Sequence, residues 1–145
     1  MKLITVAGPP SSGKTSVIIR LIECMDMPKS SIGVVKFDCL TSFDNLRYNE
    51  ANIPNETGFS GKICPDHFFV SNIEDAVQWG IESNFEMLIT ESAGLCNRCS
   101  PYINGILSIC VIDNLSGINT PRKIGPMLKF ADIVVEIGPA DEGVT

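Results

Sequence analysis

The sequence predicts an α/β fold of three layers, in which a mostly parallel central sheet lies between helices. Short apolar stretches rich in β-branched residues alternate along the chain with segments of helical character. Two of these stretches, residues 85–90 and 106–112, are continuously hydrophobic, which is typical of parallel strands covered on both faces. Because no linker interrupts the alternation, we expect one domain over residues 1–145.

The amino-terminal part of the chain predicts a strand, a loop and a helix, followed by a second strand. Residues 2–7 are apolar and β-branched, and a Gly/Pro/Ser loop follows them. Residues 16–25 are a predicted helix, because their apolar positions fall on one helical face. Residues 32–37 are the second predicted strand, and residues 42–51 have helical potential.

The middle and the end of the chain are less regular. Residues 53–71 contain two prolines and two glycines, so we expect an irregular segment with at most short strands. Asn72 has the character of a helix N-cap, with Asp75 in place of the glutamate of a capping box, and a helix is expected to begin there. Residues 121–130 are expected to hold a short helix, and residues 131–137 form the last predicted strand.

Charge and composition exclude several classes of function. The net charge of −6 argues against a general nucleic-acid binder, since no basic stripe would release counterions from a phosphate backbone. The first apolar run is too short for a signal peptide or a membrane span, so we expect a cytoplasmic protein without membrane insertion. Because the cytoplasm is reducing, the six cysteines would serve packing, metal binding or redox chemistry and not a disulfide framework. Cys24 and Cys110, in a predicted helix and a predicted strand, are assigned to the core.

The loop after the first predicted strand carries a phosphate-binding motif. GPPSSGKT, Gly8 to Thr15, fits the pattern GxxxxGK[ST], and it leaves a strand and opens a helix as the motif requires. Its backbone N–H groups and the helix dipole would hold phosphate, Lys14 would neutralise the β- and γ-phosphates, and the Thr15 hydroxyl would bind Mg²⁺. We therefore expect a P-loop nucleoside triphosphatase. Its predicted nucleotide contacts in this loop are Gly8, Ser11, Ser12, Gly13, Lys14, Thr15 and Ser16.

Two carboxylates are expected at the carboxyl edge of the sheet, where ligands of open α/β folds bind. Glu91 closes FEMLITE and is predicted to serve Mg²⁺, whereas Asp38 closes VVKFD and would hold Mg²⁺ through water or orient the attacking water. Together with Lys14 they are the predicted catalytic residues. Gly94 is predicted to offer its backbone N–H to the γ-phosphate. For both carboxylates, a solvated loop position is the alternative.

Four sequence blocks, in order, carry a resemblance to a known family. They are GPPSSGKTS, VVKFDCLTSFD, LITESAG and VIDNLSGINTPRKIGPMLKFADIVV. With them the chain resembles the nickel-handling maturation GTPases of the urease accessory and hydrogenase nickel-insertion type, which are SIMIBI-class P-loop proteins. The resemblance implies a Mg²⁺-dependent GTPase that couples nucleotide state to nickel binding and delivery. It also implies a nucleotide-dependent homodimer whose partners are a client metalloenzyme or its accessory proteins.

The resemblance further implies a transition-metal site and leaves the base open. The family has a Cys-Pro-His motif, and this chain has GKICPDHF with Asp66 inserted, so Cys64 and His67 would be the matching ligands, once from each subunit. The family's guanine-reading Asn-Lys-x-Asp segment is replaced here by EIGPADEGVT. Either the chain is truncated or altered beyond residue 135, or the base is held otherwise. GTP therefore comes from the resemblance, and ATP is the alternative.

A pair of cysteines, Cys96 and Cys99 in CNRC, departs from the urease-type pattern. With Cys64 and His67, these thiolates would form a set of three sulfurs and one nitrogen suited to Ni²⁺ or Zn²⁺. Because CNRC follows Gly94 closely, γ-phosphate binding would move the thiolates and thereby set the metal affinity. A redox pair or two unligated cysteines are the alternatives, as is a packed or solvated His67.

Two further functions stay open. The first is a regulatory module that binds a metal or an iron–sulfur cluster and turns nucleotide over only weakly. The second is a small P-loop kinase, which shares the phosphate loop. The CxxC pair and the scarcity of arginines after the loop count against the kinase.

Overall fold

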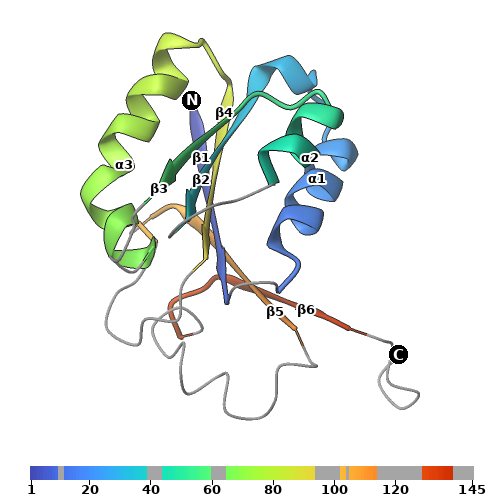
Figure 1. Cartoon of the computed structure of the whole chain (residues 1–145), viewed down its shortest axis with the longest axis vertical. Helices are drawn as coiled ribbons and strands as arrows, with labels where there is room; N and C mark the ends of the chain where they lie inside the picture. Colours follow the sequence, from blue (N-terminus) through green and yellow to red (C-terminus); the bar gives the residue numbers. More distant parts are fainter. Residues whose placement is uncertain are drawn as a thin grey trace.

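The central sheet of the computed structural model has six strands in the order β3-β2-β4-β1-β5-β6, and every pair of neighbours is parallel (Figure 1). The structure describes residues 1–9, 12–38, 44–59, 65–93, 102–103, 105–113 and 129–138. The strands are β1 (Lys2–Gly8), β2 (Ile32–Asp38), β3 (Asn55–Phe59), β4 (Met87–Ala93), β5 (Leu107–Asp113) and β6 (Ile133–Ile137). The predicted α/β fold with a mostly parallel sheet is therefore confirmed.

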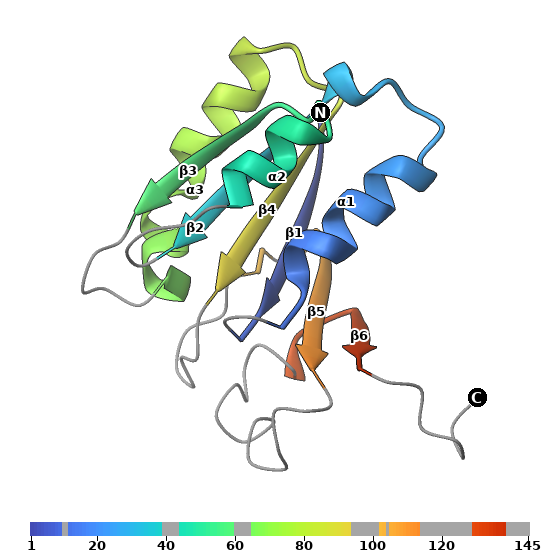
Figure 2. The same cartoon turned by 45° about the vertical axis from the view of Figure 1, so that its right-hand side comes forward.

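Helices cover both faces of the sheet, which gives the expected three layers. α1 (Lys14–Cys24) and α2 (Asp44–Glu50) lie on one face, and α3 (Pro65–Glu82) lies on the other (Figures 1 and 2). A 3-10 turn, η1 (Lys29–Ser31), connects α1 to β2. Within the described residues, no helix has the length and apolar character to cross a membrane.

The core is divided by the sheet into two apolar layers. On the α1 side, Ile89 of β4 packs with Ile18 and Ile22 of α1. On the α3 side, Leu88 of β4 packs with Ala76 of α3. Neighbouring residues of one strand thus face different layers, and both faces are covered. Burial on both faces explains why the predicted strands are apolar without alternation. Each such buried side chain stabilises the fold by about 1.5–3 kcal/mol.

The expected start of the third helix is wrong. α3 begins at Pro65, inside the segment predicted to be irregular, and Asn72 and Asp75 lie within the helix. Proline is favoured in the first turn of a helix, because its fixed φ suits the helix and its missing N–H is not needed there. The helix that was predicted to begin with a cap at Asn72 therefore begins at Pro65. β3 is the one strand within residues 53–71 among those the structure describes.

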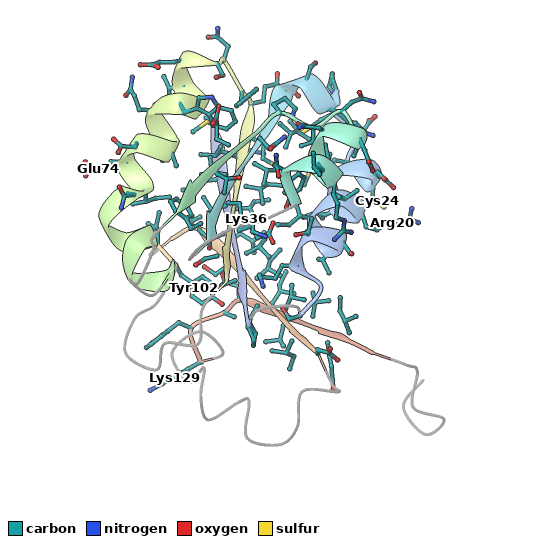
Figure 3. The ribbon with its side chains drawn as sticks, viewed as in Figure 1. Arg20, Cys24, Lys36, Glu74, Tyr102 and Lys129 are labelled. Carbon is teal, nitrogen blue, oxygen red and sulfur yellow. The ribbon has the colours of Figure 1, made fainter. Side chains whose placement is uncertain are left out.

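The two cysteines assigned to the core behave differently. Cys110 is fully buried on β5, where it packs with Ala7, as expected. Cys24 is exposed, so its assignment is wrong (Figure 3). Cys24 is the last residue of α1, and the chain turns to an extended conformation at Met25, which leaves the cysteine at the helix end outside the core. The helix expected over residues 121–130 lies outside the described residues except for its last two positions.

Candidate nucleotide and magnesium site

Two glycines allow the tight turn between β1 and α1. A Cβ atom on Gly8 would lie 2.2 Å from the carbonyl oxygen of Val111 in β5. Gly13 has a φ of 96°, a left-handed conformation that side chains other than hydrogen disfavour. The next residue, Lys14, begins α1. The loop therefore passes close to the sheet and delivers the first turn of α1 to the carboxyl edge.

Three polar side chains of the phosphate-binding motif are buried. Lys14 is 4% exposed, and its ammonium Nζ donates a hydrogen bond to the Pro9 carbonyl at 2.7 Å. The hydroxyl Oγ of Ser12 is buried and has no hydrogen-bond partner within the described part of the chain. A buried hydroxyl without a partner is costly, so Ser12 fits a ligand with acceptor oxygens, such as phosphate. The third side chain, Thr15, faces β4.

Glu91 of β4 is the centre of the site. Its side chain is 1% exposed, and Oε1 accepts a hydrogen bond from Thr15 Oγ1 at 2.7 Å. The second oxygen, Oε2, accepts a hydrogen bond from the hydroxyl of Tyr48 in α2. The ammonium of Lys36 in β2 lies 3.7 Å from Oε1. Glu91 is therefore a buried carboxylate satisfied from three separate elements, and the solvated alternative is wrong.

Burial keeps Tyr48 protonated. The loss of water around the buried ring raises the pKa of Tyr48 well above its ordinary value of 10.0, and the charge of Glu91 and the hydrogen bond to it act in the same direction. Tyr48 therefore stays a hydrogen-bond donor at neutral pH. Arg47 of the same helix donates a hydrogen bond to Ser16 Oγ at 2.7 Å, so α2 is also joined to α1.

The Thr15 and Glu91 side chains fit a magnesium ion. Both offer oxygen donors, which Mg²⁺ prefers, and the two oxygens are already adjacent. Asp38 ends β2, and its neighbour Phe37 is in register with Ser92 of β4, so the backbone of Asp38 lies at the same edge as Glu91. The side chain of Asp38 lies outside what the structure describes.

The predicted transition-metal ligands stay predictions. Cys64, Cys96 and Cys99 lie outside the described residues, as do Gly94 and Ser11 of the predicted nucleotide contacts. His67 lies in the first turn of α3, and the structure describes its backbone only. Among the side chains that the structure describes, no three cysteine, histidine or acidic residues gather as metal ligands would.

Two residues of the site escaped the sequence analysis. Lys36 could have been found, because a lysine inside the apolar strand IGVVKFD is out of place unless it is paired. Tyr48 lies in a polar, helical stretch and gives no such signal. Its burial depends on the packing of α2 against α1 and the sheet, which the sequence does not reveal.

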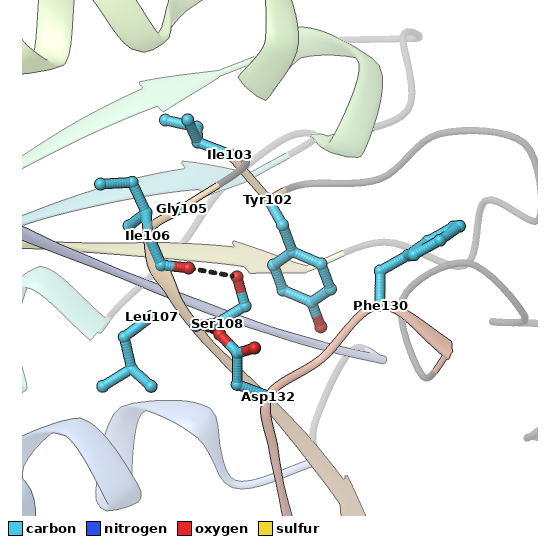
Figure 4. A pocket seen from close by; sticks show the side chains of 8 residues that line it. All are labelled: Tyr102, Ile103, Gly105, Ile106, Leu107, Ser108, Phe130 and Asp132. Atoms are coloured by element: carbon cyan, nitrogen blue, oxygen red, sulfur yellow. Dashed lines mark hydrogen bonds between the residues drawn. The ribbon is translucent and has the colours of Figure 1, made fainter.

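A cavity of about 560 Å³ lies elsewhere, where β5 and β6 begin (Figure 4). Two of its polar side chains are engaged with neighbouring residues: the Asp132 carboxylate accepts a hydrogen bond from the backbone N–H of Ser108 at 2.9 Å, and the Ser108 hydroxyl donates to the Ile106 carbonyl at 3.1 Å. None of the predicted site residues lines it. The phosphate loop and Glu91 therefore remain the candidate site.

The parallel sheet, the loop from β1 into α1 and the contact of Thr15 with Glu91 define a P-loop nucleoside triphosphatase fold. Solved structures share it. The hydrogenase maturation factor HypB from Archaeoglobus fulgidus superimposes with a TM-score of 0.68 at 22% identity, over 94% of this chain and 65% of that one. HypB from Helicobacter pylori in complex with nickel gives a TM-score of 0.69 at 22% identity, over 92% and 62%.

Sequence relatives identify the family. An uncharacterized protein of Methanocaldococcus jannaschii is 49% identical over 135 residues, which are 93% of this chain and 58% of the relative. Urease accessory protein UreG of Mycobacteroides abscessus is 30% identical over 142 residues, covering 91% of this chain and 61% of the relative. UreG of Aliarcobacter butzleri is 30% identical over 141 residues, covering 91% and 71%. The chain belongs to the urease accessory protein UreG family, and the resemblance found in the sequence is confirmed.

The match does not extend over the full length of these proteins. The chain spans 58% of the first relative and 61% of the second. No protein-family model matches the chain.

Proposed function

We propose that this protein is a Mg²⁺-dependent GTPase that couples its nucleotide state to the binding and delivery of nickel during metalloenzyme maturation. Membership of the UreG family supports the class of activity. The observation that carries the proposal is the hydrogen bond of 2.7 Å between Thr15 of the phosphate loop and Glu91 of β4. It joins the predicted phosphate-binding loop to a buried acidic group, which is the arrangement that a nucleotide-bound Mg²⁺ needs.

The residues of the loop would act by position and charge, without a covalent intermediate. Lys14 would leave the Pro9 carbonyl, to which it donates at 2.7 Å, and turn to the β- and γ-phosphates. The Ser12 hydroxyl, which has no hydrogen-bond partner among the described residues, would donate to a phosphate oxygen. Thr15 and Glu91, together with Asp38, would hold Mg²⁺, which supplies positive charge to the phosphates when bound.

Nickel is the proposed cargo. The HypB structure from Helicobacter pylori was solved in complex with nickel, and the cysteine and histidine pairs of this chain offer soft ligands. We place the cargo site at Cys64, His67, Cys96 and Cys99, with Zn²⁺ as the competing ion. Nucleotide-dependent dimerisation, GTP in preference to ATP, a client enzyme or its accessory proteins as partners, and action in the cytoplasm are further parts of the proposal.

The test is to measure metal and nucleotide binding together. Ni²⁺ and then Zn²⁺ are titrated into anaerobic protein, with and without Mg²⁺ and a non-hydrolysable analogue of GTP or of ATP, while light scattering records the mass. We expect nickel affinity and dimerisation to rise with the GTP analogue. Both gains should disappear in Cys96→Ser/Cys99→Ser and persist in Cys24→Ser, which changes an exposed cysteine at the end of α1.

Other outcomes would favour another function. Metal binding that is identical with and without nucleotide would contradict the coupling and favour a regulatory module. An iron–sulfur absorption spectrum of the purified protein would point to a cluster instead of nickel. Transfer of phosphate from the nucleotide to a small molecule, without nickel binding, would favour the kinase.

A further inference from the structure

We propose that Lys36 is a built-in counter-cation of the magnesium site. In the metal-free protein the Lys36 ammonium balances the charge of Glu91. Mg²⁺ must displace this ammonium from the Glu91 carboxylate in order to bind. The inference deepens the proposed function and rests on it, because it assigns a positioning residue to the same site. It predicts that the protein depends less on Mg²⁺ for nucleotide binding than it would without Lys36.

The position of Lys36 is fixed by the sheet. Lys36 of β2 and Glu91 of β4 are partners in the parallel register, and their charged atoms lie 3.7 Å apart. Both point to the layer that holds Val34 and Ile89, beneath α1 and α2. The side chains of Lys36 and Glu91 are 6% and 1% exposed, so water screens their interaction little.

Charge balance explains why a lysine is needed there. Glu91 is the one buried carboxylate among the described side chains, and a buried charge without a partner is costly. Tyr48 and Thr15 donate hydrogen bonds to Glu91 but carry no positive charge. Lys14 is buried as well, and its ammonium lies against Pro9 of its own loop. Lys36 therefore supplies the positive charge next to Glu91.

The same carboxylate oxygen links Lys36 to the metal. Oε1 of Glu91 accepts the hydrogen bond from Thr15 and is also the oxygen nearest to the Lys36 ammonium. A divalent cation held by Thr15 and Glu91 would be repelled by that ammonium at short range. Without Mg²⁺, the ammonium instead offsets the repulsion between Glu91 and the phosphates. Both effects reduce the gain in nucleotide affinity that Mg²⁺ gives.

The first experiment measures that gain. The dissociation constant of a fluorescent GDP analogue is determined with excess EDTA and with excess Mg²⁺, and the ratio of the two is the magnesium coupling. Lys36→Met is compared with the wild type and with Lys2→Met, which removes an exposed lysine from β1. We expect the coupling to rise about tenfold in Lys36→Met and to stay unchanged in Lys2→Met. A change of less than about twofold would overturn the proposal.

The second experiment needs no nucleotide, and it still tests the proposal if Lys36→Met is too unstable for binding measurements. Urea unfolding is followed in EDTA for the wild type, Lys36→Met and Lys36→Met/Glu91→Gln. We expect the single variant to unfold at the lowest urea concentration, and the double variant to recover because both charges are gone. If the double variant is no more stable than the single one, Lys36 does not balance Glu91 and the proposal is wrong.

The unfolding series is repeated with Mg²⁺ alone. We expect Mg²⁺ to raise the midpoint of Lys36→Met more than that of the wild type, because the carboxylate is then free for the metal. An equal rise of the midpoint in the two proteins would contradict the claim that Mg²⁺ displaces Lys36 from Glu91. These unfolding measurements separate the two proposals: a wild type that binds no nucleotide would contradict the proposed function, while the response to Mg²⁺ would still decide the role of Lys36.

Discussion

The hydroxyl of Thr15 donates a hydrogen bond of 2.7 Å to Oε1 of Glu91, and so the first turn of α1 is joined to the end of β4. This contact brings together the two chain segments that a phosphate-bound metal requires. We expect Thr15→Ala to leave nucleotide affinity in EDTA nearly unchanged and to abolish the gain from Mg²⁺, whereas Thr15→Ser keeps the hydroxyl and the gain. Calorimetric titration of GDP in the two buffers measures both. An equal gain in Thr15→Ala and wild type would contradict the magnesium role.

Lys14 is the cation expected to contact phosphate. Its side chain is buried, and its ammonium donates a hydrogen bond to the Pro9 carbonyl at 2.7 Å. We expect Lys14→Ala to weaken nucleotide binding by about tenfold to a hundredfold, since a hydrogen bond to a charged group contributes about 1.5–3 kcal/mol. Lys2→Ala, on the exposed start of β1, is the control. Turnover that survives the loss of binding would rule out the phosphate-loop mechanism.

Tyr48 tests whether Glu91 needs its second donor. Tyr48→Phe keeps the buried ring and removes the hydroxyl that donates to Oε2. We expect the free energy of unfolding to fall by about 1–3 kcal/mol, because a buried carboxylate oxygen is left unsatisfied. Urea unfolding in EDTA measures this change. Full stability in the variant would mean that another donor, or water, replaces the hydroxyl.

The raised pKa of Tyr48 predicts the direction of a pH effect. In the unfolded chain Tyr48 ionises near its ordinary value of 10.0, whereas in the folded protein burial and Glu91 keep it protonated to higher pH. The contribution of Tyr48 is therefore fully present below pH 10 and is lost as the pH rises above it. We expect the wild type to lose stability above that pH more steeply than Tyr48→Phe. Parallel curves would contradict the shift.

Gly13 and Gly105 form a matched pair of left-handed glycines, with φ of 96° and 81°. Alanine costs about 1–2 kcal/mol in that conformation, so both Gly13→Ala and Gly105→Ala should lower stability. A Cβ on Gly13 would also lie 3.0 Å from Ile137, whereas one on Gly105 meets nothing within 4 Å. We expect weaker nucleotide binding only in Gly13→Ala, measured by titration with a GDP analogue. Equal binding losses would show that general destabilisation is responsible.

Local patterns were sufficient to predict most of the fold and the phosphate loop. The run of apolar residues around Ile89 is explained by burial on both faces of a parallel sheet, and GPPSSGKT is a local sequence with a local conformation. The start of α3 was missed because two helix-start signals, Pro65 and Asn72, compete and only one can operate. Cys24 was missed because a helical face is not defined at the last residue of a helix.

The surroundings of Glu91 could not be predicted in the same way. Thr15, Lys36 and Tyr48 come from three elements far apart in the sequence, and their convergence depends on strand order and helix packing. A hydrophobic pattern records which face a residue occupies but not which partner it meets there. The identity of Glu91 as an edge carboxylate was therefore predictable, whereas its donors were not.

Because Tyr48 contacts Glu91, the stability of α2 also reports on the state of the Glu91 carboxylate. A helix of seven residues is too short to persist in water by itself, so α2 depends on what its side chains reach in the interior. Its backbone amides should therefore exchange with solvent deuterium more slowly when the hydrogen bond from Tyr48 to Glu91 is strong, and faster when that bond weakens. Mg²⁺ or nucleotide arriving at the carboxylate would then be visible, without any label, in the deuterium exchange of α2.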